Sequence, residues 1–142
     1  MQLAQFNIGR TAAPLGSPAM AGFEDALDEI NALADASPGF VWRLEDDDGH
    51  ATSFRPYDDE RTIINLSVWE SVDDLKAFTY KTDHARFLRR RREWFEPMDE
   101  AFLVLWWVPP GHRPSIEEAV GRLEELRSAG PTEEAFTFRT VP

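Results

Sequence analysis

Apolar and polar residues alternate in two segments of the chain, residues 2–10 and 62–69, and this alternation predicts a half-buried strand in each. One side of the two strands is apolar and consists of Ala4, Phe6, Ile8, Ile64, Leu66 and Val68. The other side carries amide, hydroxyl and indole groups, from Gln5, Asn7, Asn65, Ser67 and Trp69. Because successive side chains of a strand point to opposite faces, we expect these polar residues to share one face of a sheet.

Two more strands are predicted at residues 40–45 and 101–108, and a shorter, less regular one near 52–55. Residues 101–108 (AFLVLWWV) are apolar at every position, which predicts a strand that is covered on both faces. Trp106 and Trp107 are consecutive and must point to opposite faces, so one of them should lie on the polar face.

Helices alternate with these strands, and each begins at a capping signal. The signals are Ser17 followed by Pro18, Ser71 with Asp74, and Ser115 with Glu118. A further helical piece should begin near Thr82 and end before Pro97, since proline does not continue a helix. The last helix should end at Gly130, and residues 135–141 are expected to be extended, as an edge strand or as a segment docked on a neighbour.

The order strand, helix, strand, strand, helix, strand, helix predicts an α+β domain of the ferredoxin-like type, with an antiparallel sheet and helices on one face. We expect one domain over residues 1–142, with a core at about 2–108 and an added helix and tail in 115–142. The polar face is then the uncovered one. It is too aromatic to remain in water, so we predict a homodimer in which two such faces enclose a polar-lined cavity.

Composition narrows the range of partners. The 142 residues carry a formal net charge of −11, which argues against nucleic acids and anionic membrane surfaces, because these need a basic footprint. The chain has no cysteine, which excludes disulfides and thiolate metal sites. The first ten residues do not resemble a signal peptide and no apolar run is long enough to span a membrane, so we expect a cytoplasmic protein.

Three histidines supply the near-neutral titrating side chains. His84 could serve as a base or ligand at the mouth of a pocket, or as a helix-end residue bonded to the backbone. His112 follows a Pro-Pro-Gly turn and could line the same site, whereas His50 belongs to an acidic turn and is expected to be exposed. Their spacing matches no metal-binding motif, so we predict no metal site.

A run of four arginines, residues 89–92, could clamp an anionic ligand because guanidinium groups bind carboxylates in a bidentate manner. The alternative is ion pairing with Asp83, Glu93 and Glu96 on a solvated helix face. We favour ion pairing, because four consecutive helical residues fan around the axis and cannot all face one site. Residues 46–48, all aspartate, are expected to form a solvated turn rather than a calcium loop.

A distinctive set of residues runs from the third strand into the following helices: Asn65-Leu-Ser-Val-Trp69-Glu-Ser71, then Leu75, Phe78, His84 and Phe87. This set resembles the dimeric α/β-barrel superfamily, which contains the antibiotic-biosynthesis-type monooxygenases. The resemblance covers about residues 2–108. The whole chain, with residues 105–112 (LWWVPPGH) and the added helix, looks more like an uncharacterised branch of that superfamily, a domain of unknown function.

In that superfamily, cofactor-free monooxygenases that oxidise phenolic polyketides or quinols carry an Asn-x-x-x-Trp arrangement on the third strand, which Asn65 and Trp69 match. The resemblance implies that the amide binds a substrate phenolate or peroxy intermediate and that the indole N–H donates a second hydrogen bond. The tyrosine and arginine that complete that site cannot be placed in the sequence. Haem-degrading members pair a strand-one asparagine with a helix-two histidine ligand. Asn7 matches the first, but Leu88 stands at the position of the second and His84 lies one turn before it, so haem binding is left as a third, less favoured hypothesis.

The sequence therefore leads to a first hypothesis: a homodimer that binds a small, partly aromatic molecule and acts as a cofactor-independent monooxygenase. Asn65 would orient the ligand, Trp69 would donate a hydrogen bond, and His84 would handle a proton. The rest of the lining is expected to come from Asn7, Ser67, one of Trp106 and Trp107, and His112. The alternative is a non-catalytic binding or assembly module in which these residues only hold the dimer together.

Overall fold

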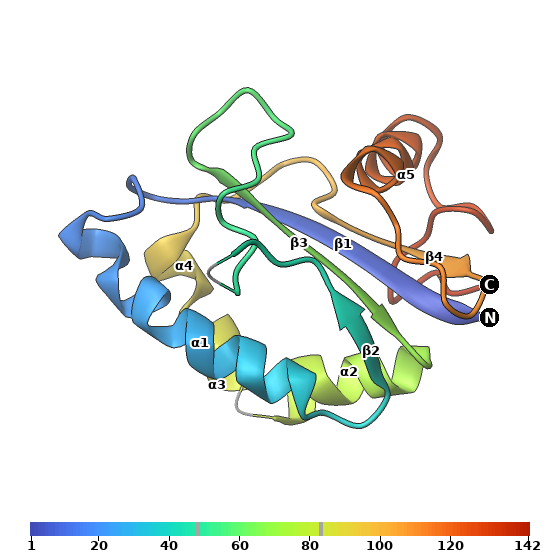
Figure 1. The fold of residues 1–142 in the computed structure, drawn as a ribbon. Coiled ribbons are helices and arrows are strands. Elements are labelled where there is room, and N and C mark those ends of the chain that lie inside the picture. Colours follow the sequence, from blue (N-terminus) through green and yellow to red (C-terminus); the bar gives the residue numbers. More distant parts are fainter. Residues whose placement is uncertain (48, 83) are drawn as a thin grey trace.

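The protein is described by a computed structural model that covers residues 1–47, 49–82 and 84–142. Within these residues, four strands form one antiparallel sheet in the order β2-β3-β1-β4 (Figure 1). The strands are β1 (Gln2–Arg10), β2 (Phe40–Arg43), β3 (Thr62–Trp69) and β4 (Leu103–Val108). The two alternating segments of the sequence are thus the two central strands, and their pairing brings Gln5 opposite Ser67 and Asn7 opposite Asn65.

Two of the three helices predicted from capping signals begin at those signals, whereas a 3-10 turn begins after Ser17 and the α-helix itself begins three residues later, at Ala21. The helices are α1 (Ala21–Asp35), preceded by the 3-10 turn η1 (Pro18–Met20), α2 (Val72–Lys81), α3 (His84–Leu88), α4 (Arg91–Trp94) and α5 (Ile116–Ala129). The side chain of Ser71 accepts a hydrogen bond from the Asp74 amide, and Ser115 accepts one from the Glu118 amide, which confirms both capping boxes. The single helical piece expected after Thr82 is instead two short helices, α3 and α4.

Three strand predictions differ from the structure. β2 ends at Arg43 instead of residue 45, β4 begins at Leu103 instead of residue 101, and residues 52–55 form no strand. The predicted turn at residues 46–48 is only partly testable, because residue 48 lies outside the described residues. The tail does reach the sheet edge: Phe136 and Leu105 exchange both backbone hydrogen bonds, at 2.8 and 2.9 Å, so the extended tail adds one bridge to β4.

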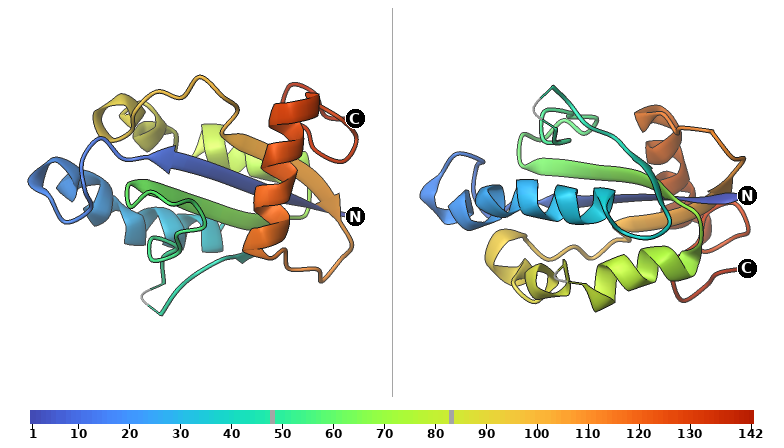
Figure 2. Two further views of the ribbon diagram at one scale, coloured as in Figure 1. Left: turned by 90° about the horizontal axis from the view of Figure 1, so that it is seen from above. Right: turned by 60° about the horizontal axis from the view of Figure 1, so that its bottom comes forward.

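Both faces of the sheet are covered by helices. The apolar face packs against α5, whose inward residues Ala119 and Leu123 are fully buried with Phe6, Leu66 and Trp106. Figures 1 and 2 show α5 crossing the strands on this side, with α1 and α2 on the opposite side. The expectation that the polar face is the uncovered one is therefore wrong, because α1 and α2 lie over that face and α5 covers the other.

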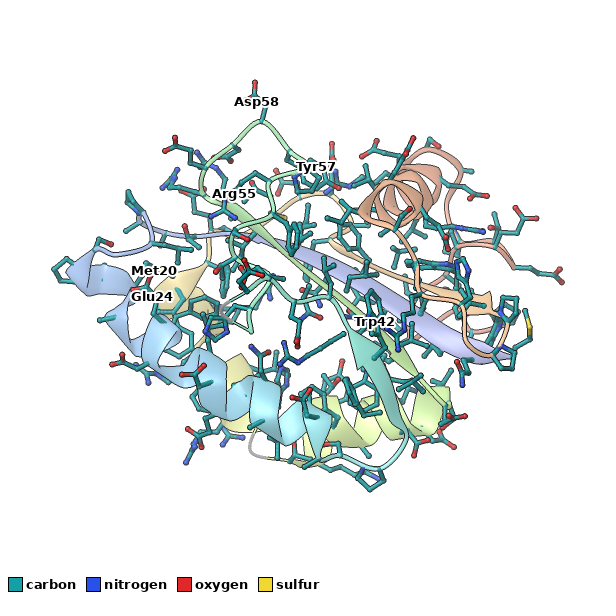
Figure 3. The ribbon with its side chains drawn as sticks, viewed as in Figure 1. Met20, Glu24, Trp42, Arg55, Tyr57 and Asp58 are labelled. Atoms are coloured by element: carbon teal, nitrogen blue, oxygen red, sulfur yellow. The ribbon has the colours of Figure 1, made fainter. Side chains whose placement is uncertain are left out.

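The loop between β2 and β3 also contributes to the α5 side. Tyr57 in this loop and Trp42 on β2 both pack against the cluster that contains the α5 residues, and Figure 3 labels both side chains. Arg43 follows Trp42 and therefore points to the polar face, where it pairs across the sheet with Ser67. Trp42 thus belongs to the α5 side of the sheet and Arg43 to the polar face.

Candidate functional site: a cavity over the polar face of the sheet

A cavity of about 430 Å³ lies between the polar face of the sheet and the helices α1, α2 and α3. Its floor is formed by β1 and β3, including Gln5, Asn7, Asn65 and Ser67. The walls are largely apolar and aromatic, and they include Leu27, Ile30, Leu75, Phe78, Phe87, Trp94 and Phe95. An apolar cavity of this size with a few converging polar groups has the form of a small-molecule site.

The polar floor is a connected hydrogen-bond network centred on Gln5, whose side chain is only 3% exposed. Its Nε2 donates to Oδ1 of Asn65 at 2.5 Å and to Oγ of Ser67 at 3.0 Å. Its Oε1 accepts from Nδ2 of Asn7 at 2.9 Å. Because every polar atom of the Gln5 amide is engaged, the network fixes the orientation of both asparagines.

Asn65 is the floor residue most accessible to a ligand. It is exposed although it lies in the middle of a central strand, so the cavity is open to solvent above it. Its Oδ1 is occupied by Gln5, and among the described residues its Nδ2 group has no hydrogen-bond partner. Asn65 therefore presents two N–H donors to a bound molecule, which is the chemistry needed to hold a phenolate oxygen.

Trp69 is a wall of the cavity rather than a donor. Its indole Nε1–H donates to Oγ of Ser67 at 2.9 Å, and the side chain is 1% exposed. The ring stacks on Phe78 with centroids 5.1 Å apart. The expected hydrogen bond from Trp69 to a ligand is not available in this arrangement, because the one indole donor is already used.

His84 opens α3 and lines the cavity from the helix side. Its Nδ1 lies 3.1 Å from the backbone carbonyl of Thr79, to which it donates, and its ring packs on Phe78 with centroids 4.8 Å apart. Burial lowers the pKa of His84 below its ordinary value, although the bond to Thr79 opposes this shift. The imidazole is therefore neutral near pH 7, and its Nε2 lone pair has no partner among the described residues.

Three of the residues expected to line the site lie elsewhere. Trp106 is fully buried beneath α5, and its Nε1–H donates to Glu118 at 2.9 Å. His112 lies 2.8 Å from the other oxygen of the same carboxylate, on the α5 side of the sheet. Trp107 is on the polar face but beyond the cavity, beside Phe136 at a ring-centroid distance of 5.8 Å. The structure thus brings together Asn7, Asn65, Ser67, Trp69 and His84, and it separates Trp106, Trp107 and His112 from them.

The cavity also contains polar residues that the sequence did not point to. His50 was expected to be exposed, but it is half-buried and lines the cavity, where Asn31 of α1 donates to its Nδ1 at 3.0 Å. Asn31 lies four residues after Leu27, so the helical period places both on the inward side of α1. This spacing is the one sequence feature that could have identified Asn31 as a residue of the cavity lining. Arg91, from the arginine run, is a third such residue. The loop that carries His50 and the short helix α4 that carries Arg91 have no regular pattern of apolar residues.

Gly9 allows an aromatic ring to close one end of the cavity. An ideal Cβ at this position would lie 2.7 Å from Cδ1 of Phe95, which is closer than real contacts allow. The absence of a side chain on β1 therefore lets the Phe95 ring lie directly on the strand. Phe23 of α1 packs edge-on against Phe95, with centroids 5.2 Å apart, so the end wall joins helix and sheet.

Among the described residues there is no group of three His, Cys, Asp or Glu side chains that could hold a metal ion. None of the helices described is both long and apolar enough to cross a membrane.

A family model described as "Domain of unknown function (DUF3291)" matches residues 2–142. The chain belongs to the DUF3291 family. No curated protein matches it. Solved structures similar to this DUF3291 chain show the same fold. One, named "Putative antibiotic biosynthesis monooxygenase from Nitrosomonas europaea", is 14% identical with a TM-score of 0.52, over 78% of this chain and 92% of that one.

A second similar structure is a protein of unknown function, also from Nitrosomonas europaea. It is 14% identical with a TM-score of 0.52, over 80% of the DUF3291 chain and 95% of its own. These likenesses establish the fold predicted from the sequence, an α+β ferredoxin-like arrangement of the antibiotic-biosynthesis-monooxygenase type with an added C-terminal helix. At this identity they carry no information about activity.

Proposed function

We propose that this DUF3291 chain binds a small phenolic or quinol-type aromatic molecule in the cavity and oxidises it with molecular oxygen, without a cofactor. The observation that carries the proposal is the pairing of two complementary groups in one aromatic cavity. His84 offers a neutral Nε2 that can take a proton, and Asn65 offers N–H donors to the oxygen that loses it.

The proposed chemistry begins with proton transfer from the phenolic hydroxyl to Nε2 of His84. Asn65 donates to the resulting phenolate, and the aromatic walls hold the ring and limit access of water. The electron-rich phenolate then reacts with oxygen. In the net reaction, an aromatic C–H and an O–H are lost, one oxygen atom becomes a new ring carbonyl, and the other leaves as water. Because the substrate supplies all the electrons, the reaction needs no separate reductant.

Oxygen consumption with a panel of quinols and polycyclic phenols tests the proposal. We expect Asn65→Ala to lower kcat by about 10²–10³-fold, the effect of removing one donor to a developing anion. Asn31→Ala is a matched control, since Asn31 lines the same cavity but its amide binds Gly49 and His50. We expect His84→Gln to lower kcat by about 10²–10⁴-fold, while His112→Gln leaves it unchanged.

Three outcomes would change the proposal. If no member of the panel is turned over but 2-naphthol binds, the chain is a binding module, an alternative favoured by the engagement of the Trp69 N–H with Ser67. If hemin binds with a Soret band that disappears in His84→Ala, the cavity is a haem site. Equal turnover by wild type and Asn65→Ala would show that the Asn65 amide takes no part in the reaction.

A further inference from the structure

Arg91, the first residue of α4, places a guanidinium group in the cavity wall. The group lies over the ring of Phe102 at 4.4 Å and near the ring of Phe95 at 5.5 Å. The side chain is half-buried, and this burial lowers the pKa of Arg91, although it stays protonated at neutral pH. Aromatic rings attract the cation, but they provide no oxygen for its five N–H donors.

No described residue supplies an acceptor for Arg91. The two nearest acids in the sequence are used by other arginines: Glu93 binds Arg90 at 2.9 Å, and Glu96 binds Arg10 at 2.5 Å. The expectation that residues 89–92 form surface ion pairs is confirmed for Arg90, whereas Arg91 has no ion pair with any of the described residues. Asp83, another expected partner, lies outside the described residues.

The rest of the cavity lining, as far as it is described, also provides no acidic partner for Arg91. The chain has 26 Asp and Glu residues, yet the described lining contains neither type. Arg43 is the other arginine in the lining, and it is neutralised by Asp35 at 2.8 Å and Glu45 at 3.2 Å. With His84 neutral, Arg91 is therefore a positive charge without a counter-ion among the described residues of the lining.

We propose that the cavity ligand is an aromatic carboxylate whose carboxylate group pairs with Arg91 while its ring lies among the aromatic walls. A carboxylate is the planar anion that matches the guanidinium fork, and it would supply the acceptors that the described residues do not give Arg91. Joined to the proposed function, on whose aromatic cavity site it rests, this inference narrows the substrate to a hydroxylated aromatic carboxylic acid. The carboxylate would bind Arg91 and the hydroxyl would bind Asn65 and His84.

Isothermal titration calorimetry with two probes of equal size tests the inference without requiring turnover. The probes are 2-naphthoate, which is an anion at pH 7.5, and 2-naphthamide, which is neutral. We expect wild type to bind 2-naphthoate about tenfold more tightly, as a charge-assisted hydrogen-bonded pair implies. Arg91→Gln should abolish the preference and Arg91→Lys should keep part of it. Arg92→Gln, an exposed neighbour in the same run, should leave it unchanged.

Each result bears on a different part of the proposal. Equal affinity of wild type for the two probes, or a preference that persists in Arg91→Gln, would overturn the assignment of Arg91. The comparison within wild type needs no variant, so a folding defect in Arg91→Gln cannot obscure it. Binding of neither probe would contradict both this inference and the aromatic ligand of the proposed function. A preference for 2-naphthoate without oxygen consumption would sustain the carboxylate site and reject only the oxidation.

Discussion

Ser67→Ala is the substitution that tests the polar network most sharply. Ser67 is 6% exposed, and its Oγ accepts from Gln5 and from the indole of Trp69. Alanine removes this acceptor and leaves two buried donors without a partner. An unsatisfied buried donor costs about 1–3 kcal/mol, and the adjoining cavity lets water reach part of the site, so we expect a loss of about 2–3 kcal/mol in the free energy of unfolding.

Urea denaturation followed by circular dichroism measures this loss. Ser128→Ala is the control, because Ser128 is exposed on α5 and its removal should change the free energy of unfolding by less than about 0.5 kcal/mol. A double-mutant cycle with Trp69→Phe isolates the indole bond. Trp69→Phe should cost about 1 kcal/mol less in the Ser67→Ala background than in wild type, since the orphaned N–H is then removed. A Ser67→Ala protein as stable as wild type would refute the proposed network.

Two further predictions concern His84 and α5. Because burial lowers the pKa of His84 in the folded state, the unfolded chain is protonated first as the pH falls through about 6.5. Wild type should therefore lose stability on acidification relative to His84→Gln in pH-dependent urea denaturation, and parallel profiles of the two proteins would contradict the burial of His84. Leu123→Ala, at a fully buried position of α5, should cost about 2–5 kcal/mol. Leu27→Ala should cost less because it only widens the open cavity, and equal costs would contradict the role given to α5.

The sheet could be predicted from the sequence because its pattern is local. The alternation in residues 2–10 and 62–69 identifies the two faces of the central strands, and the register then places Asn7 opposite Asn65. The capping boxes at Ser71 and Ser115 were equally local signals, and both helices begin there. These features depend on the spacing of apolar residues and on contacts between residues that are close in the sequence, so the sequence alone is enough to predict them.

Which helix covers which face could not be predicted in the same way. The amphipathic patterns of α1 and α5 are similar in kind, and nothing in either states which side of the sheet it will cover. The predicted homodimer depended on an open polar face, and that face lies beneath α1 and α2. The dimer stays a prediction, now without this face as its interface, and light scattering at micromolar concentration tests it.

The candidate site residues also divide into those that a local pattern identifies and those that only the packing of distant segments brings to the cavity. Asn65 and Trp69 share a strand face and were found together, whereas His50 and Arg91 reach the cavity from a loop and a short helix. The positions of those two side chains depend on how distant segments pack, which no local pattern encodes. The Trp69 donor was expected from a resemblance and is instead engaged with Ser67 two residues away, a contact that requires the side-chain geometry.

The five tryptophans provide the most direct test of the cavity as the binding site. Trp69 and Trp94 line it, while Trp42 and Trp106 lie on the α5 side and Trp107 lies beyond it. The indole N–H signals of protein labelled with 15N-tryptophan can be followed by NMR during titration with 2-naphthol. We expect the signals of Trp69 and Trp94 to shift in a saturable manner while the other three stay in place. Shifts centred on Trp42 or Trp106, or no shift at saturating 2-naphthol, would contradict binding in the cavity.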